Sequence, residues 1–128
     1  MKTYSINKIK NEVQKLVISP SVTEEQAEAS MKSLQNFNQC MLGIVYFSGT
    51  TLWECHKDDE FLQVVEGKVD VMVLTNEGRI NQSLQGGDCF IVPKGLWHRQ
   101  FSQQGVKVMF ITSLEGNQTS TEENPEKR

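Results

Sequence analysis

Short stretches in which apolar and polar residues alternate, separated by turn residues, fill the chain from residue 40 to residue 113. The stretches 40–49, 69–75 and 106–113 are rich in valine, isoleucine and phenylalanine, which favour extended structure. Turns separate such stretches at intervals of about eight to twelve residues, as in antiparallel sandwiches and barrels. No helical period lies between them, so crossover helices are not expected. The pattern predicts an all-β, antiparallel barrel or sandwich with its core in residues 40–114.

Two glycine-containing segments inside this region are predicted turns. Residues 66–68 follow an acidic strand, and Gly67 is expected to close a hairpin there. Residues 103–105 form a similar signal that ends in Gly105. Each turn would divide the chain into two short strands.

The segments on either side of the barrel core have a different character. Residues 1–39 are predicted to form an N-terminal arm, with a short edge strand at 17–19 that Pro20 ends. Within 21–34, Thr23 followed by Gln26, or Ser21 followed by Glu24, has the spacing of a helix capping box. The apolar face of this segment is weak, so one or two helical turns and a loop are both open.

The tail, residues 115–128, contains no aromatic residue. Such a segment buries too little apolar area to offset the entropy of ordering it. The tail is therefore predicted to be disordered.

The candidate chemistry starts in the stretch WECHKDDEFLQVVEG, residues 53–67. Glu54, His56, Asp58 and Glu60 are spaced two residues apart, and alternate side chains of a strand share one face. If the stretch is one strand, two or more carboxylates and an imidazole line the same side of the sheet. Asp58 is more simply explained as part of a solvated turn.

A second group of candidate residues includes His98. His56 and His98 are the two histidines of the chain. An antiparallel barrel can place distant strands side by side, and thereby bring the two imidazoles together. Two imidazoles and Glu60 form a facial triad of the kind that binds non-haem iron or manganese. With Glu54 added, two neutral and two anionic ligands balance a divalent ion. Gln100 shares the parity of His98 and is expected to add a polar contact inside.

These residues resemble the two sequence motifs of the cupin family. In the first motif Glu54 stands at the first histidine position, with the rest of the pattern matched by three residues: His56, Glu60 and Gly67. Its opening glycine is displaced by one position, to Gly49. In the second motif the match consists of Gly87, Pro93, Gly95 and His98, and Ser102 replaces an asparagine. The resemblance covers residues 40–113 and identifies the chain as a small single-domain cupin.

The resemblance implies a β-barrel of jelly-roll type, often a homodimer, with a metal site inside the barrel mouth. It implies His56, Glu60 and His98 as metal ligands, with iron, manganese, nickel or zinc as the candidate ions. Glu54 either replaces the family's histidine as a ligand or hydrogen-bonds inside a wet pocket.

Cupins include dioxygenases, isomerases, decarboxylases, lyases and proteins that only bind ligands, so the fold leaves function open. Three hypotheses follow. The first is a metal-dependent, dioxygenase-like or related enzyme that acts on a small organic molecule. The second is a non-catalytic module that binds or senses a small ligand. The third is a metal-free isomerase or epimerase in which Glu54 or Glu60 is the catalytic base.

The net charge and the composition of the chain limit the classes of partner that it is expected to bind. The 128-residue chain has a net charge of -3 and no basic stripe, which argues against nucleic acid and anionic membranes as partners. No apolar run is long enough to span a bilayer, and the first residues lack the apolar core of a signal peptide. The three cysteines (Cys40, Cys55 and Cys89) form no CxxC pair and are expected to be reduced. We therefore expect a cytoplasmic protein.

Overall fold

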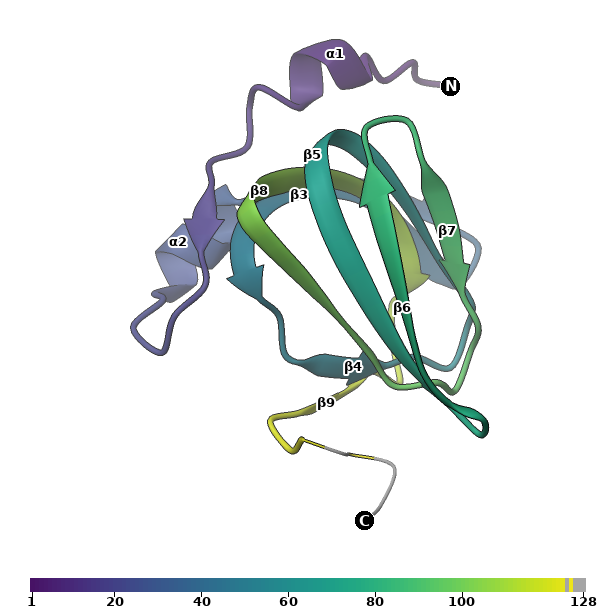
Figure 1. Cartoon of the computed structure of the whole chain (residues 1–128). Coiled ribbons are helices and arrows are strands. Elements are labelled where there is room, and N and C mark those ends of the chain that lie inside the picture. Colours follow the sequence, from purple (N-terminus) through teal and green to yellow (C-terminus); the bar gives the residue numbers. More distant parts are fainter. Residues whose placement is uncertain (124, 126–128) are drawn as a thin grey trace.

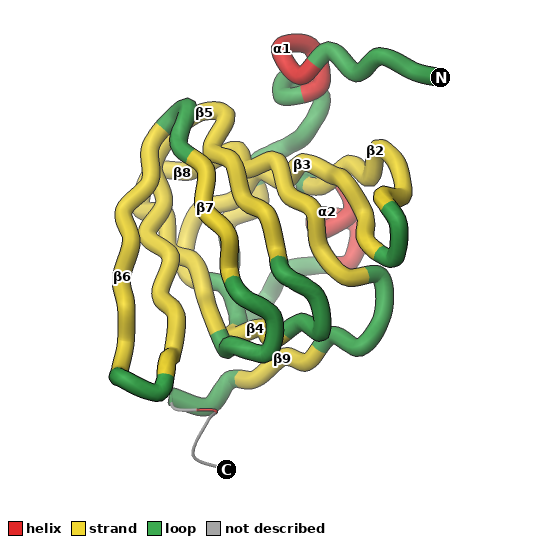
Figure 2. Tube along the Cα trace, turned by 90° about the vertical axis from the view of Figure 1, so that its right-hand side faces the viewer, coloured by secondary structure: helices red, strands yellow, loops and turns green. Residues whose placement is uncertain are grey.

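Two long antiparallel strands, β5 (Glu60–Thr75) and β8 (His98–Ser113), form the centre of a curled sheet in the computed structural model (Figure 1). The structure describes residues 1–123 and 125. The other elements are α1 (Ile6–Ile9), β1 (Leu16–Val17), α2 (Glu24–Ala29), β2 (Met31–Phe37), β3 (Cys40–Thr50), β4 (Trp53–Cys55), β6 (Gly78–Gln85), β7 (Cys89–Val92) and β9 (Gln118–Ser120). Except for β1 and β3, which are parallel, the strand pairs are antiparallel. The predicted all-β, antiparallel architecture is confirmed (Figure 2).

The two central strands bend at glycines that face each other. Gly67 and Gly105 have φ of 94° and 124°, a backbone region open mainly to glycine. A Cβ atom on Gly67 would lie 2.4 Å from the carbonyl oxygen of Gly105. The predicted hairpin at Gly67 is therefore wrong, as is the turn at 103–105: both segments are bends inside continuous strands.

The bend in β5 changes which side chains face the core. Before it the buried residues are Glu60, Leu62 and Val64, and after it the residues buried in the main core are Val69, Val71 and Val73. The pairing with β8 shifts register between Val64 and Glu66 and again between Gly67 and Asp70, as in a β-bulge. The bend thus lets one strand line the barrel interior along its whole length.

The N-terminal arm joins the sheet. The expected capping box is confirmed: Gln26 N–H donates to Thr23 Oγ1, and Thr23 N–H donates to the Gln26 side chain. The helix, α2, ends at Ala29, and the rest of the expected helical segment forms β2, which pairs with β3. β1 pairs with the far end of β3, ahead of Pro20. No described helix has the length and apolar character needed to cross a bilayer.

The described part of the tail differs from the predicted disorder. β9 pairs with β4 through Trp53–Ser120, Glu54–Thr119 and Cys55–Gln118. Strand β4 pairs with β8 at Glu54 alone, so its backbone groups are free to take a second partner. Residues 124 and 126–128 lie outside the described residues.

Candidate metal centre

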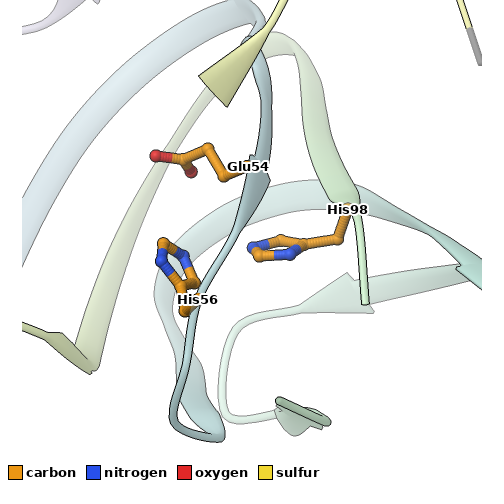
Figure 3. A group of neighbouring side chains, drawn as sticks. All are labelled: Glu54, His56 and His98. Atoms are coloured by element: carbon orange, nitrogen blue, oxygen red, sulfur yellow. The ribbon is translucent and has the colours of Figure 1, made fainter. Parts of the chain in front are cut away.

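Four polar side chains meet where β4, β5 and β8 begin or end. Glu60 is the first residue of β5 and His98 the first of β8, while Glu54 lies in β4 opposite His98. His56 follows the last residue of β4. Glu54, His56 and His98 extend into the same space (Figure 3), with their ligand atoms within 4.8 Å of one another.

A loop, and not a continuous strand, produces this convergence. The stretch from residue 56 to residue 59 is irregular, so the expectation that 54, 56, 58 and 60 line one strand face is wrong. Gly95 N–H donates to the His56 carbonyl over 2.8 Å, and Lys94 N–H donates to Asp59 Oδ1 over 2.9 Å. These bonds hold the Pro93–Gly95 turn against the loop and fix His98 next to Glu60.

Asp58 points out of this group, as its solvated-turn interpretation predicts. Its carboxylate accepts hydrogen bonds from Gln39 Nε2 at 3.0 Å and Ser113 Oγ at 2.8 Å. These bonds lower the pKa of Asp58, with the bond from Gln39 as the largest cause. Asp58 therefore anchors the loop to the neighbouring strand.

The Glu60 carboxylate lies between the two imidazoles. Glu60 Oε1 is 2.9 Å from His98 Nε2, and Oε2 is 3.3 Å from His56 Nε2. Both rings are buried, with His98 0% and His56 6% exposed, and Glu60 is 6% exposed. The ring centroids are 5.2 Å apart.

The outer nitrogens of both rings have partners that orient them. Asn117 Nδ2 donates to the Ser113 carbonyl, so its Oδ1 faces His56 Nδ1 at 2.7 Å and accepts a hydrogen bond there. His98 Nδ1 is 3.4 Å from the Leu96 carbonyl. With the proton on Nδ1 in each neutral ring, both Nε2 lone pairs point at the common centre.

His56 Nε2 lies at ion-pair distance from Glu60 but outside hydrogen-bond geometry. It is buried and, among the described residues, has no partner in hydrogen-bond geometry, although Glu60 is nearby. Buried polar atoms without partners are rare and call for an explanation. Two imidazole nitrogens and two carboxylates around one point suit a divalent cation, so these residues fit the metal of the family they resemble.

The ionisable side chains of the centre shift one another's pKa. Burial is the largest influence on the pKa of Glu60 and would raise it, but the adjacent imidazoles of His56 and His98 lower it to about 2. Burial opposes protonation of His56, yet Glu60, Asn117 and Glu54 raise its pKa to about 9. Burial, followed by repulsion from Glu60, raises the pKa of Glu54. In the metal-free protein the centre therefore holds protons that a cation would displace.

A pocket of about 270 Å³ adjoins three of the four side chains, those of Glu54, His56 and Glu60. Its lining is mainly apolar: Leu16, Ile18, Met31, Val45, Phe47, Leu62, Val108 and Phe110. The polar lining residues are Thr51, Glu54, His56, Glu60, Gln100, Thr112 and Asn117. The site therefore combines a polar end with an apolar chamber, the usual composition of a small-molecule site.

The sequence analysis missed Asn117 because the residue lies in the segment expected to be disordered. No local signal marks it, since its role depends on β9 returning the chain to β4. Trp53 and Trp97 are buried and pack with Leu74. Neither tryptophan lines the pocket.

The comparisons agree with the motifs. The family model described as Cupin matches residues 21–127. That range covers most of the 128 residues, and the chain belongs to the cupin family. The fold and the small single-domain cupin predicted from the two motifs are confirmed. A search of curated proteins finds no match.

Solved structures with the same fold include enzymes. A cupin-2 domain protein from Shewanella frigidimarina is 27% identical, with a TM-score of 0.56, covering 66% of this chain and 79% of the other. Hydroquinone 1,2-dioxygenase from Sphingomonas sp. TTNP3, with 4-hydroxybenzoate bound, is 18% identical, with a TM-score of 0.57 and coverage of 68% and 66%. An oxalate oxidase is 22% identical, with a TM-score of 0.53 and coverage of 62% and 45%. At these identities the two enzymes show the shared fold alone.

Proposed function

We propose that this cupin binds one divalent metal ion through His56, Glu60 and His98, with Glu54 as a fourth ligand, and acts on a small organic molecule in the adjoining pocket. The observation that carries the proposal is the pair of buried Nε2 atoms facing the Glu60 carboxylate, at 3.3 Å for His56 and 2.9 Å for His98, with no hydrogen-bond partner for His56 Nε2 among the described residues. Iron, manganese, nickel and zinc all accept such a mixed ligand set.

The bound ion would supply Lewis-acid or redox chemistry at the polar end of the pocket. The protein residues hold and orient the reactants. Asn117 and the Leu96 carbonyl fix the imidazole tautomers, and the apolar walls exclude water from the substrate. Glu54 and Gln100 also line the pocket, where they would orient a substrate beside the ion. The dioxygenase and oxalate oxidase of the same fold make oxygen-dependent chemistry the first class to screen.

Elemental analysis of untagged protein purified without chelator tests the proposal. We expect about one metal ion per chain, loss of the ion in His98→Ala and His56→Ala, and retention in Glu77→Ala, an exposed carboxylate in the β5–β6 turn. Circular dichroism confirms that each variant is folded. Protein that takes up no iron, manganese, nickel or zinc contradicts the proposal.

A second candidate is metal-free proton transfer, as in an isomerase or epimerase. The observation that favours it is that Glu54 and Glu60 both line the pocket, where burial and repulsion from Glu60 raise the pKa of Glu54 while the imidazoles lower that of Glu60. Carboxyl groups with such divided pKa values can act as acid and base. Exchange of a substrate carbon-bound proton with solvent in metal-free protein identifies this activity. Binding without exchange or turnover identifies a ligand-sensing module.

We further propose a cytoplasmic homodimer. The free thiols of Cys40, Cys55 and Cys89 support a reducing compartment. In the described chain β2 pairs only with β3, which leaves its outer edge open, and Phe37 at its end is 54% exposed. Open edges and exposed apolar side chains favour association with a second copy.

A further inference from the structure

The side chain of Gln100 lines the pocket, and its buried amide oxygen makes no hydrogen bond that would stabilise the fold. Gln100 is 7% exposed, and its Oε1 has no hydrogen-bond partner among the described residues. Its backbone groups are both satisfied by Thr51: Gln100 N–H donates to Thr51 Oγ1 over 3.0 Å, and Thr51 N–H donates to the Gln100 carbonyl over 2.9 Å. The backbone is therefore fixed while the amide is unpaired.

Such an amide is suited to a ligand. An unpaired buried amide oxygen is unfavourable, so a molecule that pairs with it gains affinity. The last side-chain torsion of glutamine is broad, which lets the amide present its oxygen or its nitrogen to the pocket. Gln100 shares strand β8 with His98, two residues away on the same face, so a ligand paired with the amide lies close to the proposed metal centre.

The charge of the pocket argues against an anionic ligand. The residues that line the pocket include no lysine or arginine. A divalent cation with two neutral imidazoles and the carboxylates of Glu54 and Glu60 has no net charge. A histidine at position 54 would leave that set with one positive charge. Glu54 therefore removes the attraction that a carboxylate substrate would otherwise meet.

The size and walls of the pocket define the rest of the ligand. A volume of about 270 Å³ is at the small end for ligand sites. Phe47, Leu62, Val108 and Phe110 offer an apolar surface, on which a single ring or short hydrocarbon body packs well.

We infer that the pocket selects a small uncharged molecule with an apolar body and a hydroxyl group, such as a phenol or an alcohol, which hydrogen-bonds to the Gln100 amide. Small carboxylates are disfavoured. The charge argument rests on the proposed metal centre, whereas the argument from Gln100 is independent of it.

Three probes of one ring each test this inference: phenol, toluene and benzoate. Toluene has the shape of phenol without its hydroxyl, and benzoate adds a negative charge. Binding is followed by titrating each probe and recording backbone amide chemical shifts. The proteins are the wild type, whose metal content has been measured, and the variant Gln100→Leu. The control is Gln103→Leu, which changes an exposed glutamine of the same strand. We expect phenol to bind the wild type about three- to tenfold more tightly than toluene, the range of one neutral hydrogen bond. The preference disappears in Gln100→Leu and persists in Gln103→Leu.

The same titrations test whether the pocket disfavours a negatively charged ligand. Phenol binds the metal-loaded wild type more tightly than benzoate, and Glu54→His shifts the preference toward benzoate. The ranking of the probes in the wild type needs no variant, so it stands even where a variant fails to fold.

The outcomes separate the two proposals. Protein that takes up no iron, manganese, nickel or zinc when incubated with each ion, yet keeps a Gln100-dependent preference for phenol over toluene, overturns the proposed function and supports this inference. Metal-loaded protein that binds toluene or benzoate as tightly as phenol overturns this inference and leaves the metal centre in place.

Discussion

Asn117 Oδ1 accepts a hydrogen bond from His56 Nδ1 over 2.7 Å, although 61 positions separate the two residues in the sequence. The bond turns the opposite nitrogen of His56 toward His98 and Glu60. A residue of the C-terminal segment thereby sets the orientation of a candidate metal ligand.

Asn117→Ala is expected to weaken metal binding about 10- to 100-fold, as is typical when the outer partner of a ligating histidine is lost. The side chain of Asn117 also raises the pKa of His56, so that pKa should fall in the variant. Competition with a chromophoric chelator measures the affinity, and histidine proton shifts measure the pKa. Asn81→Ala, in the exposed part of β6, is the control. Equal affinities in the two variants contradict the role of Asn117.

The stability of metal-free protein should depend on pH on both sides of a maximum. His56 has its pKa raised from 6.5 to about 9, so its contribution is complete below 6.5 and is lost as pH rises through 9. The pKa of Glu54 is raised above 4.5, so its contribution is complete below 4.5 and is lost as pH rises above that value, because ionising the buried carboxyl is unfavourable. Glu60 has its pKa lowered from 4.5 to about 2, so its contribution is present above 4.5 and is lost as pH falls through 2.

Urea unfolding at pH 6 and pH 9.5 checks the alkaline side. We expect the free energy of unfolding to be lower at pH 9.5 in metal-free protein, and the difference to shrink in His56→Gln. Metal affinity should rise over the same interval, because binding displaces the His56 proton. A pH-independent metal affinity contradicts the protonated state assigned to His56.

Gly67→Ala is expected to destabilise the protein by about 2 kcal/mol or more, because strain at positive φ adds to a backbone clash. The new Cβ would lie 2.4 Å from the Gly105 carbonyl oxygen. Gly87→Ala is a matched control: its φ is 95° against 94° at Gly67, and nothing lies within 4 Å of its Cβ position. Urea unfolding should therefore show a smaller loss of unfolding free energy in Gly87→Ala than in Gly67→Ala. Equal losses would mean that the positive φ alone, and not the clash, causes the destabilisation.

Light scattering of the purified protein at micromolar concentration tests the proposed homodimer. The expected mass is twice that of the chain, because the open edge of β2 and the exposed Phe37 favour association. Phe37→Lys is expected to shift the mass toward the monomer if this edge is the interface. A monomeric wild type contradicts the dimer.

Much of the fold and part of the site follow from the sequence. Alternation of apolar and polar residues identified the strands, and the capping pair Thr23 and Gln26 marked the start of α2. The two motifs selected His56, Glu60 and His98, whose imidazole and carboxylate groups the structure brings into contact. These features are local, because side-chain type and spacing over a few residues are enough to specify them.

Tertiary structure decided the remainder, because the local spacing of apolar and polar residues does not specify which distant strands pair. The local sequence at Gly67 predicts a hairpin turn. In the structure β5 pairs with β8 on both sides of Gly67, so β5 continues through a bend. The loop at 56–59 turns the two motifs toward each other through the bond from Gly95 to His56. By itself the sequence determined which chemical groups are available to this protein. Its period also placed Gln100 on the face of His98, whereas only the long-range pairing of β9 with β4 decided that Asn117 joins them.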